Sequence, residues 1–217
     1  MGTMLPMQMR HNLPKARIVD RYSWAAELSR GLRVIHCGFA GQEHRGALHR
    51  VLLGSAKDLI GIDVDENAVA EAERAGWKVF LANCQDRAAM RSLNIRADLI
   101  VAAEIIEHLD SPGPFLDAMH ELGDTLLVTT PNAASMVNAV AALAHRELVN
   151  EDHVSWFSWY TLSNILSRHH WDVNEFAVYR YREAGSFLGR LTFGAQNALS
   201  YLSPFIGYGL AALSRSS

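Results

Sequence analysis

The feature that most constrains the fold is a regular alternation of short apolar runs with longer helical patterns. Runs of strand length occupy residues 33–37, 59–64, 78–82, 98–102, 125–130, 173–181 and about 209–214. Helical patterns occupy about 46–53, 66–75, a segment opened by residues 110–112, 135–148 and 160–169. The helix predicted at 66–75 has a preferred residue at each end: Asp65 can cap its start and Gly76 can end it. Leucine-rich and β-branched runs separated by helices predict a parallel sheet covered on both faces.

Composition narrows the class of protein. The 217 residues suffice for one domain with a substantial core, and 49% hydrophobic with 20% charged residues excludes wholesale disorder. A net charge of -3, with no dense Lys/Arg tract, argues against nucleic acid as the main partner. The two cysteines cannot build a disulfide framework and suggest a reducing compartment. We therefore expect a cytoplasmic protein with a flexible tail over residues 1–16 and one domain over 17–217.

The apolar stretch from Phe187 to Leu213 raises the question of membrane contact. Arg190, Gln196, Asn197 and Pro204 interrupt it, and its clean part is shorter than the roughly 18–20 residues that a spanning helix needs. A spanning helix is not expected. Peripheral contact with a membrane, or with a lipid-linked ligand, through residues 187–213 stays open as a hypothesis.

Small and polar residues follow the first four strands, where ligands bind in a doubly wound sheet. Gly38, Ala40 and Gly41 come after the first strand, where small side chains let backbone approach a ligand. Later strands end in polar residues: Asp63 after the second, Asn83 and Cys84 after the third, and Glu104, Glu107 and His108 after the fourth. A carboxylate at Asp63 could accept both hydroxyls of a ribose. A second helix cap beside Asp65 is the alternative, but the position of Asp63 at a strand end with a following helix favours the ribose role.

Taken in order, these segments resemble a known family. HCGFAGQ, LIGIDVDENAV, FLANCQD, ADLIVAAEIIEHLDSPGPFLDAM and LLVTTPN look like the motifs of class I S-adenosylmethionine-dependent methyltransferases. EDHVSWFSWYTLSNILSRHHWDV is similar to the segment that leads into that family's antiparallel sixth strand. The E-x-x-E-H-L signature resembles the group that includes ubiquinone-pathway and natural-product O-methyltransferases. The likeness covers roughly residues 17–215.

The resemblance carries several expectations. It implies an α/β fold of the Rossmann-like, doubly wound kind, with a mostly parallel seven-stranded sheet, helices on both faces and a helical insert at about 185–205. It implies S-adenosyl-L-methionine as cofactor and a methyl acceptor that is a small molecule, a sugar or a lipid-linked glycan, with a hydroxyl as the favoured nucleophile. The cofactor-binding residues that it predicts are Gly38, Ala40, Gly41, Asp63, Val64, Asn83, Cys84 and Glu104. A dinucleotide dehydrogenase is disfavoured, because Glu43 would lie beside a pyrophosphate that needs G-x-G-x-x-G.

Three interpretations compete for the group formed by Glu104, Glu107 and His108. If the stretch is helical, spacings of three and four put these residues on one face. His108, with Glu107, is our predicted catalytic pair, with His108 as general base for the acceptor hydroxyl. Alternatively, the three join His153 around a divalent ion, as a similar arrangement does in small-RNA 2′-O-methyltransferases, or they only pack and hydrogen-bond in the pocket wall. No metal is included in the favoured site.

The first loop departs from the family pattern at His36, Ala40 and Gln42. His36 replaces the carboxylate that the family uses near the methionyl amino group, so we expect weakened cofactor binding and tighter binding in His36→Asp. These departures keep a second hypothesis open, in which the domain is a non-catalytic cofactor-binding or scaffold protein. The retained Asp63 and E-x-x-E-H-L group argue for the enzyme.

Overall fold

The structure, a computed structural model, describes residues 13–41, 46–180 and 187–217 of the chain. Gln42 and Glu43, on which two of the arguments above depend, lie outside these residues. Eight strands form one sheet in the order β1-β7-β8-β6-β5-β2-β3-β4. The strands are β1 (Arg17–Val19), β2 (Arg33–Cys37), β3 (Asp58–Asp63), β4 (Val79–Leu81), β5 (Leu99–Ala103), β6 (Thr125–Pro131), β7 (Trp171–Tyr179) and β8 (Gly209–Ser216).

All pairings in this sheet are parallel except those of β8, which runs antiparallel to β6 and β7. The chain starts the main sheet at β2, moves outward through β3 and β4, and then returns to the other side of β2 with β5. The carboxyl ends of β2 and β5 therefore flank the point where strand order reverses. Ligands bind at such a point in open α/β sheets.

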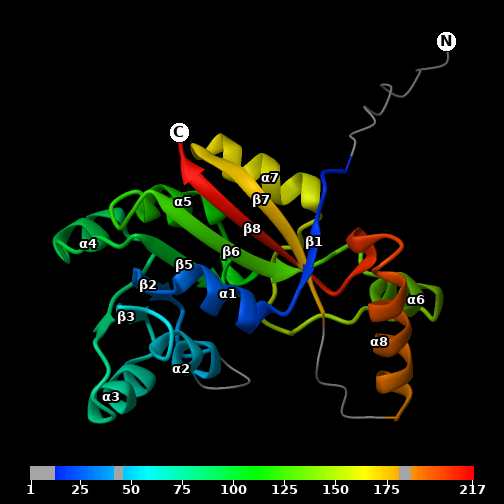
Figure 1. Cartoon of the computed structure of the whole chain (residues 1–217), viewed down its shortest axis with the longest axis horizontal. Coiled ribbons are helices and arrows are strands. Elements are labelled where there is room, and N and C mark those ends of the chain that lie inside the picture. Colours follow the sequence, from blue (N-terminus) through cyan, green and yellow to red (C-terminus); the bar gives the residue numbers. More distant parts are fainter. Residues whose placement is uncertain (1–12, 42–45, 181–186) are drawn as a thin grey trace.

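Helices cover both faces of the sheet (Figure 1). They are α1 (Arg21–Ser29), α2 (Ala47–Leu53), α3 (Glu66–Arg74), α4 (Arg87–Ser92), α5 (Pro112–Met119), α6 (Met136–Leu143), α7 (Trp159–Arg168) and α8 (Phe187–Leu199), with short 3₁₀ turns at Ile106–His108 and Pro204–Ile206. In Figure 1, α6 and α8 lie together at the opposite end of the molecule from α3 and α4. Among the described residues, no helix has the length and hydropathy needed to cross a membrane.

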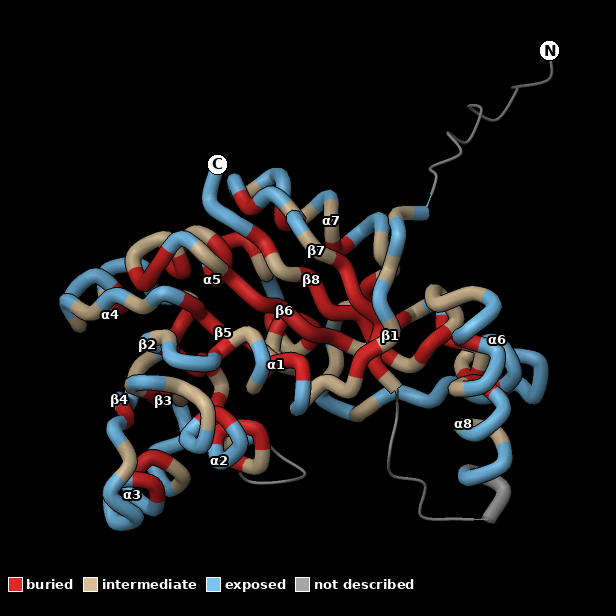
Figure 2. Tube along the Cα trace, in the orientation of Figure 1, coloured by how far each residue is buried: buried red, intermediate tan, exposed pale blue. Residues whose placement is uncertain are grey.

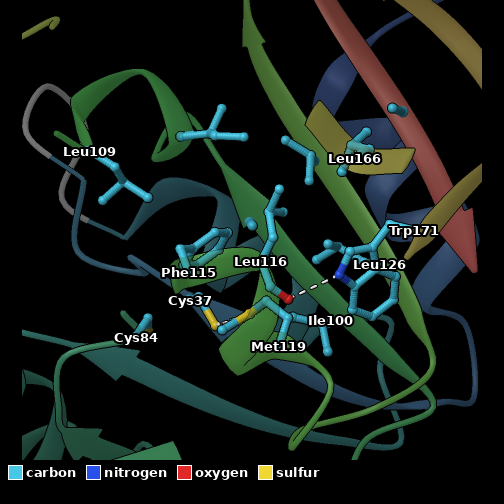
Figure 3. Packing of buried hydrophobic residues seen from close by; sticks show 14 of the residues in the cluster. Cys37, Cys84, Ile100, Leu109, Phe115, Leu116, Met119, Leu126, Leu166 and Trp171 are labelled. Carbon is cyan, nitrogen blue, oxygen red and sulfur yellow. Dashed lines mark hydrogen bonds between the residues drawn. The ribbon is translucent and has the colours of Figure 1, made fainter. Parts of the chain in front are cut away.

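Among the described residues, two large hydrophobic clusters and a smaller one around Phe39 hold the layers together, and the alternation of strand side chains decides which cluster each residue joins. Figure 2 shows the buried residues concentrated along the central strands. In β2, Ile35 and Cys37 join the larger cluster with residues of α5 and α7, whereas Val34 faces α1 and α2 in the second cluster. Within the larger cluster, the indole N–H of Trp171 donates to the Leu116 carbonyl at 3.0 Å (Figure 3). His36, between Ile35 and Cys37 in the strand, therefore points toward the α1 and α2 face.

The predicted α/β class and the doubly wound parallel sheet are confirmed, with one more strand than expected. The additional strand is β1, which pairs with β7 at the edge of the sheet. Helices α1 and α4 were also not predicted, and α6 is shorter than the expected 135–148. Cys37 and Cys84 are buried free thiols.

Candidate active site

A cavity of about 1600 Å³ opens at the carboxyl ends of the central strands. Its walls come from the loops after β2, β3, β4 and β5, from the start of α1, and from residues 148–154. All predicted cofactor-binding and catalytic residues line it: Gly38, Ala40, Gly41, Asp63, Val64, Asn83, Cys84, Glu104, Glu107 and His108. Strand order therefore sets these side chains along one edge, from Glu104 through Gly38 and Asp63 to Asn83.

The loop after β2 brings backbone close to the cavity. Gly38 has φ +66°, and a Cβ there would lie 3.1 Å from Ile105 Cδ1, so the position is both left-handed and crowded. Gly41 also has a positive φ, of +55°, but has open space around it. A side chain at Gly38 would strain the turn and push on Ile105, whereas Ala40 adopts an ordinary conformation.

Asp63 ties this loop to the end of β3. One carboxylate oxygen accepts the Ala40 N–H at 2.9 Å, and the other accepts the N–H groups of Val64 at 2.8 Å and Asp65 at 3.0 Å. Asp65 separately caps α3 through Asn67 and Ala68. Asp63 thus organises the loop and, with further lone pairs on each oxygen, keeps the capacity to accept ribose hydroxyls.

The residues after β3 and β4 form the end of the cavity farthest from Glu104. Val64 is 64% exposed, although it is a large apolar residue. Asn83 is also exposed and accepts the Gln85 N–H through its side-chain oxygen at 2.9 Å, while Cys84 is buried. An exposed apolar surface beside amide and backbone polar groups suits a flat heterocycle.

Glu104 sits at the centre of a network that the sequence analysis did not foresee. Its Oε1 accepts the Tyr179 hydroxyl at 2.6 Å and the Thr129 hydroxyl at 3.2 Å, and its Oε2 lies 3.1 Å from Arg21 Nη1. The backbone of Glu104 has φ +55°, a strained conformation for a residue with a side chain. Burial, reinforced by the charge of Glu104, raises the pKa of the Tyr179 hydroxyl well above its ordinary value.

Glu107, His108 and His153 form a second cluster. Each offers one ligand atom that lies within 4.8 Å of the other two. Glu107 is 1% exposed, and neither carboxylate oxygen has a hydrogen-bond partner in the described part of the chain. Burial, together with the charge of Glu104, raises the pKa of the Glu107 carboxyl well above its ordinary value.

Backbone contacts hold His153 against this cluster. The Glu107 carbonyl accepts the N–H groups of Val154 at 3.0 Å and Ser155 at 3.1 Å, and His108 Nδ1 lies 3.2 Å from the Asp152 carbonyl oxygen. The His108 and His153 rings meet edge to face, with their centroids 4.6 Å apart.

The conditional expectation that residues 104–108 form a helix with one functional face is wrong. Glu104 is left-handed, and only Ile106–His108 form a 3₁₀ turn, so Glu104 does not join the ligand group of Glu107, His108 and His153, although its charge still acts on Glu107. Ile106 is fully buried in the core, which fixes the turn.

His36 is buried against His49 on α2. The two Nδ1 atoms are 3.3 Å apart, so one ring donates and the other accepts, and His49 also stacks on Trp77 at 4.7 Å between centroids. Burial, with the positive charge of Arg50, lowers the pKa of His49 to about 4. Burial, followed by His49 and Arg21, lowers the pKa of His36 well below its ordinary value. Sequence reasoning missed Arg21, His49 and Tyr179, since none belongs to a local pattern.

Comparisons with known proteins agree with this geometry. A family model described as a methyltransferase domain matches residues 16–175. A sequence search of curated proteins gives no match. Among solved structures, the chain is similar to a SAM-dependent methyltransferase from Archaeoglobus fulgidus, with 15% identity, 89% of this chain and 90% of that chain covered, and a TM-score of 0.62.

Two further structures show the same fold. Magnesium protoporphyrin IX methyltransferase from Synechocystis PCC 6803, solved with bound SAH, is 12% identical over 90% of this chain and 80% of that chain, with a TM-score of 0.58. The small RNA methyltransferase HEN1 is 16% identical over 96% of this chain but only 27% of its own, with a TM-score of 0.63. The family match and the shared architecture confirm the resemblance seen in the motifs: the chain belongs to the methyltransferase-domain family, and its fold is that of the S-adenosylmethionine-dependent methyltransferases.

Proposed function

We propose that this protein binds S-adenosylmethionine and transfers its methyl group to a hydroxyl group of a small-molecule, sugar or lipid-linked acceptor. The observation that carries the proposal is that Gly38, Asp63 and Asn83 line the same cavity. They follow the adjacent strands β2, β3 and β4, which is the order that the methionine, ribose and adenine parts of the cofactor require. The left-handed turn at Gly38 would bring backbone against the cofactor, Asp63 would hold the ribose hydroxyls, and Val64, Asn83 and Cys84 would border the adenine.

When bound, the cofactor supplies a methyl group on a sulfonium, so the protein has to align the acceptor and remove its proton. His108 is suited to the second task. The Asp152 carbonyl can only accept a hydrogen bond, so the 3.2 Å contact puts the proton on Nδ1 and leaves a lone pair on Nε2. A neutral imidazole with a free Nε2 is a general base near neutral pH. Glu107, buried and favouring its protonated form, would position this group rather than accept the proton.

Calorimetry with S-adenosylmethionine and S-adenosylhomocysteine tests the binding step. We expect both to bind, and we expect Asp63→Asn to weaken binding by about tenfold or more, since a charged hydrogen-bond acceptor is lost. Asp86→Asn is the matched control, because Asp86 also accepts backbone N–H groups after a strand, as the cap of α4, but does not line the cavity. No binding of either compound at high micromolar concentration would favour the scaffold hypothesis.

A divalent-metal-assisted reaction is the second candidate, and a specific observation favours it. Both buried carboxylate oxygens of Glu107 lack a hydrogen-bond partner among residues 13–41, 46–180 and 187–217, and the side chain lies close to His108 and His153. Carboxylate oxygens and imidazoles are a ligand set that Mg²⁺ or Mn²⁺ accepts. An ion there would use the same His108 Nε2 lone pair that general base catalysis needs.

Electron paramagnetic resonance of added Mn²⁺ separates the two candidates. If the cluster binds metal, the free Mn²⁺ signal falls on adding protein, and Glu107→Gln or His153→Ala restores it. His169→Ala is the matched control, since His169 pairs with Asp117 at 2.8 Å on another part of the surface. An unchanged Mn²⁺ signal with the wild-type protein eliminates the metal candidate and leaves general base catalysis by His108 or a packing role in the pocket wall, which the turnover of His108→Ala separates.

A further inference from the structure

Helix α8 turns polar residues inward and apolar residues outward. Gln196 is fully buried, and its Oε1 accepts the Val137 N–H of α6 at 2.8 Å. Ser200, just after the helix, is also fully buried, whereas Leu191 and Leu199 are exposed. A surface helix of a globular protein ordinarily has the opposite arrangement. Helix α8 is therefore attached to α6 through polar contacts and presents an apolar side to the surroundings.

The apolar surface continues over α6 and the turn after α8. Leu143, at the end of α6, is 85% exposed, and Leu202, after α8, is 83% exposed. The two helices lie together at one end of the molecule (Figure 1), and Figure 2 shows both largely exposed. Extended exposed apolar surface of this kind marks an interaction site. We call these exposed residues the outer apolar face: Val140, Leu143, Leu191, Leu199, Tyr201 and Leu202.

The charges that border this face are mainly positive. Three arginines lie on or beside the segments that form it: Arg146, Arg180 and Arg190. The guanidinium carbon of Arg180 lies 5.1 Å from the ring centroid of Tyr201. In residues 132–149 and 187–217 of the sequence, the one carboxylate is Glu147. A chain with a net charge of -3 therefore has an excess of positive charge around its outer apolar face.

We propose that the outer apolar face is a docking surface for an anionic lipid bilayer. Its apolar side chains would enter the boundary between headgroups and acyl chains, and the arginines would contact anionic headgroups. Tyr201, which lies against Arg180, has the amphipathic ring that membrane interfaces favour. A second copy of the chain fits less well, because a symmetric dimer would bring the three arginines of one face against those of the same face on its partner.

The proposal narrows the membrane hypothesis for residues 187–213, because Leu210, Ala211 and Ala212 of β8 are buried in the sheet and take no part. It also relates the face to the active site. Leu148 and Trp156 line both the main cavity and a smaller cavity of about 310 Å³ along α6, with the carboxylates of residues 151–152 on the side of the main cavity. Docking would bring this mouth close to the bilayer, so an acceptor with an apolar chain could enter from the lipid; that last step rests on the proposed function.

Flotation of the full chain with lipid vesicles tests the docking surface. We expect at least about fivefold more protein to float with phosphatidylglycerol vesicles than with phosphatidylcholine vesicles at low salt, and the difference to shrink at high salt. No flotation with phosphatidylglycerol, or equal flotation with both, would overturn the proposal. The experiment contains no cofactor, so its failure is distinct from a failure to bind S-adenosylmethionine, which would refute the proposed function alone.

Variants assign the binding to the face. Leu143→Gln combined with Leu202→Gln should weaken vesicle binding by about tenfold or more, and Arg190→Gln by about fivefold. Leu53→Gln on α2 and Arg74→Gln on α3 are the matched controls, since both residues are exposed and lie away from α6 and α8.

Urea unfolding of each variant reports whether it is folded, and the controls should bind vesicles like wild type. Equal losses in variants and controls would overturn the proposal. So would a wild-type dimer in light scattering without vesicles that becomes a monomer in the double leucine variant, because the face would then be a subunit interface.

Discussion

The free energy of unfolding of this protein should decrease strongly as the pH falls below neutrality, because of the buried pair His36 and His49. His49 is fully buried, and its pKa is lowered to about 4 from an unfolded value near 6.5. The unfolded chain therefore takes up a proton below pH 6.5 that the folded His49 rejects until about pH 4. The resulting stability is fully present above pH 6.5 and is lost as the pH falls toward 4.

The size of the effect follows from the shift. A difference of about 2.5 pKa units corresponds to about 3 kcal/mol when complete, and to about 2 kcal/mol already at pH 5. His36 adds to the loss with the same sign, because its pKa is also lowered. Glu107 acts in the opposite direction, since its raised pKa makes the folded state bind protons. Such amounts are a large fraction of the 5–15 kcal/mol that usually separates folded from unfolded states.

Urea unfolding at pH 7.5 and at pH 5 gives the free energy of unfolding of wild-type protein and of His49→Leu. Because Glu107 is present in both proteins, its contribution cancels when the two pH profiles are subtracted. We expect wild type to lose about 2 kcal/mol more than the variant over this range. His145→Asn, an exposed histidine with a positive φ, should follow wild type. Parallel pH profiles for wild type and His49→Leu would refute the reasoning, as would an NMR titration showing His49 protonated near pH 6.5.

Three further predictions concern chemistry and packing. His108→Ala should lower turnover about 10²- to 10⁴-fold with little change in S-adenosylhomocysteine affinity, measured with an acceptor identified by mass spectrometry of co-purifying compounds; near-normal turnover would remove His108 as base. Trp171→Phe should lower the free energy of unfolding by about 2 kcal/mol in urea, because the Leu116 carbonyl loses its buried donor and a void is left; a loss too small to measure would show that the core repacks. His36→Asp, expected from the sequence to bind cofactor more tightly, should show little gain in calorimetry if Glu104, at the end of the neighbouring strand, already serves the methionyl end; a tenfold gain would restore the original expectation.

The central strands could be predicted from sequence because burial on both faces leaves a continuous apolar run. Strand β2 was predicted with its observed bounds, and α3 within one residue at its end, since Asp65 and Gly76 mark both ends chemically. Strand β1 escaped because it has three residues and is defined by pairing with β7, far along the chain. Helix α1 buries Trp24, Ala25 and Ser29, which form no periodic apolar stripe.

The sequence could predict cavity-lining residues where a residue type follows a strand, and it missed those that the fold brings in from distant segments. Asp63 and Glu104 were identified from their positions at strand ends. Arg21 could not be identified from the sequence, because it reaches Glu104 only through the packing of α1 against the sheet. The conformation of residues 104–108 was also not predicted, because a left-handed glutamate is unfavourable in itself. Its side chain is held by hydrogen bonds from Tyr179 on β7 and Thr129 on β6, which are distant in the sequence.

The unusual histidine in the first loop can be understood from these distant segments. His36 lies on β2, next to β5, which carries Glu104 at its end, so a carboxylate on β5 can serve the part of the cavity that the family serves from β2. An aspartate at position 36 would be buried on the α1 face, near Arg21, and would compete with Glu104 for its charge. A neutral histidine paired with His49 avoids that competition and leaves Arg21 committed to Glu104. A histidine at position 36 is therefore compatible with the Arg21–Glu104 ion pair, and calorimetry with S-adenosylhomocysteine tests directly whether this loop binds the cofactor.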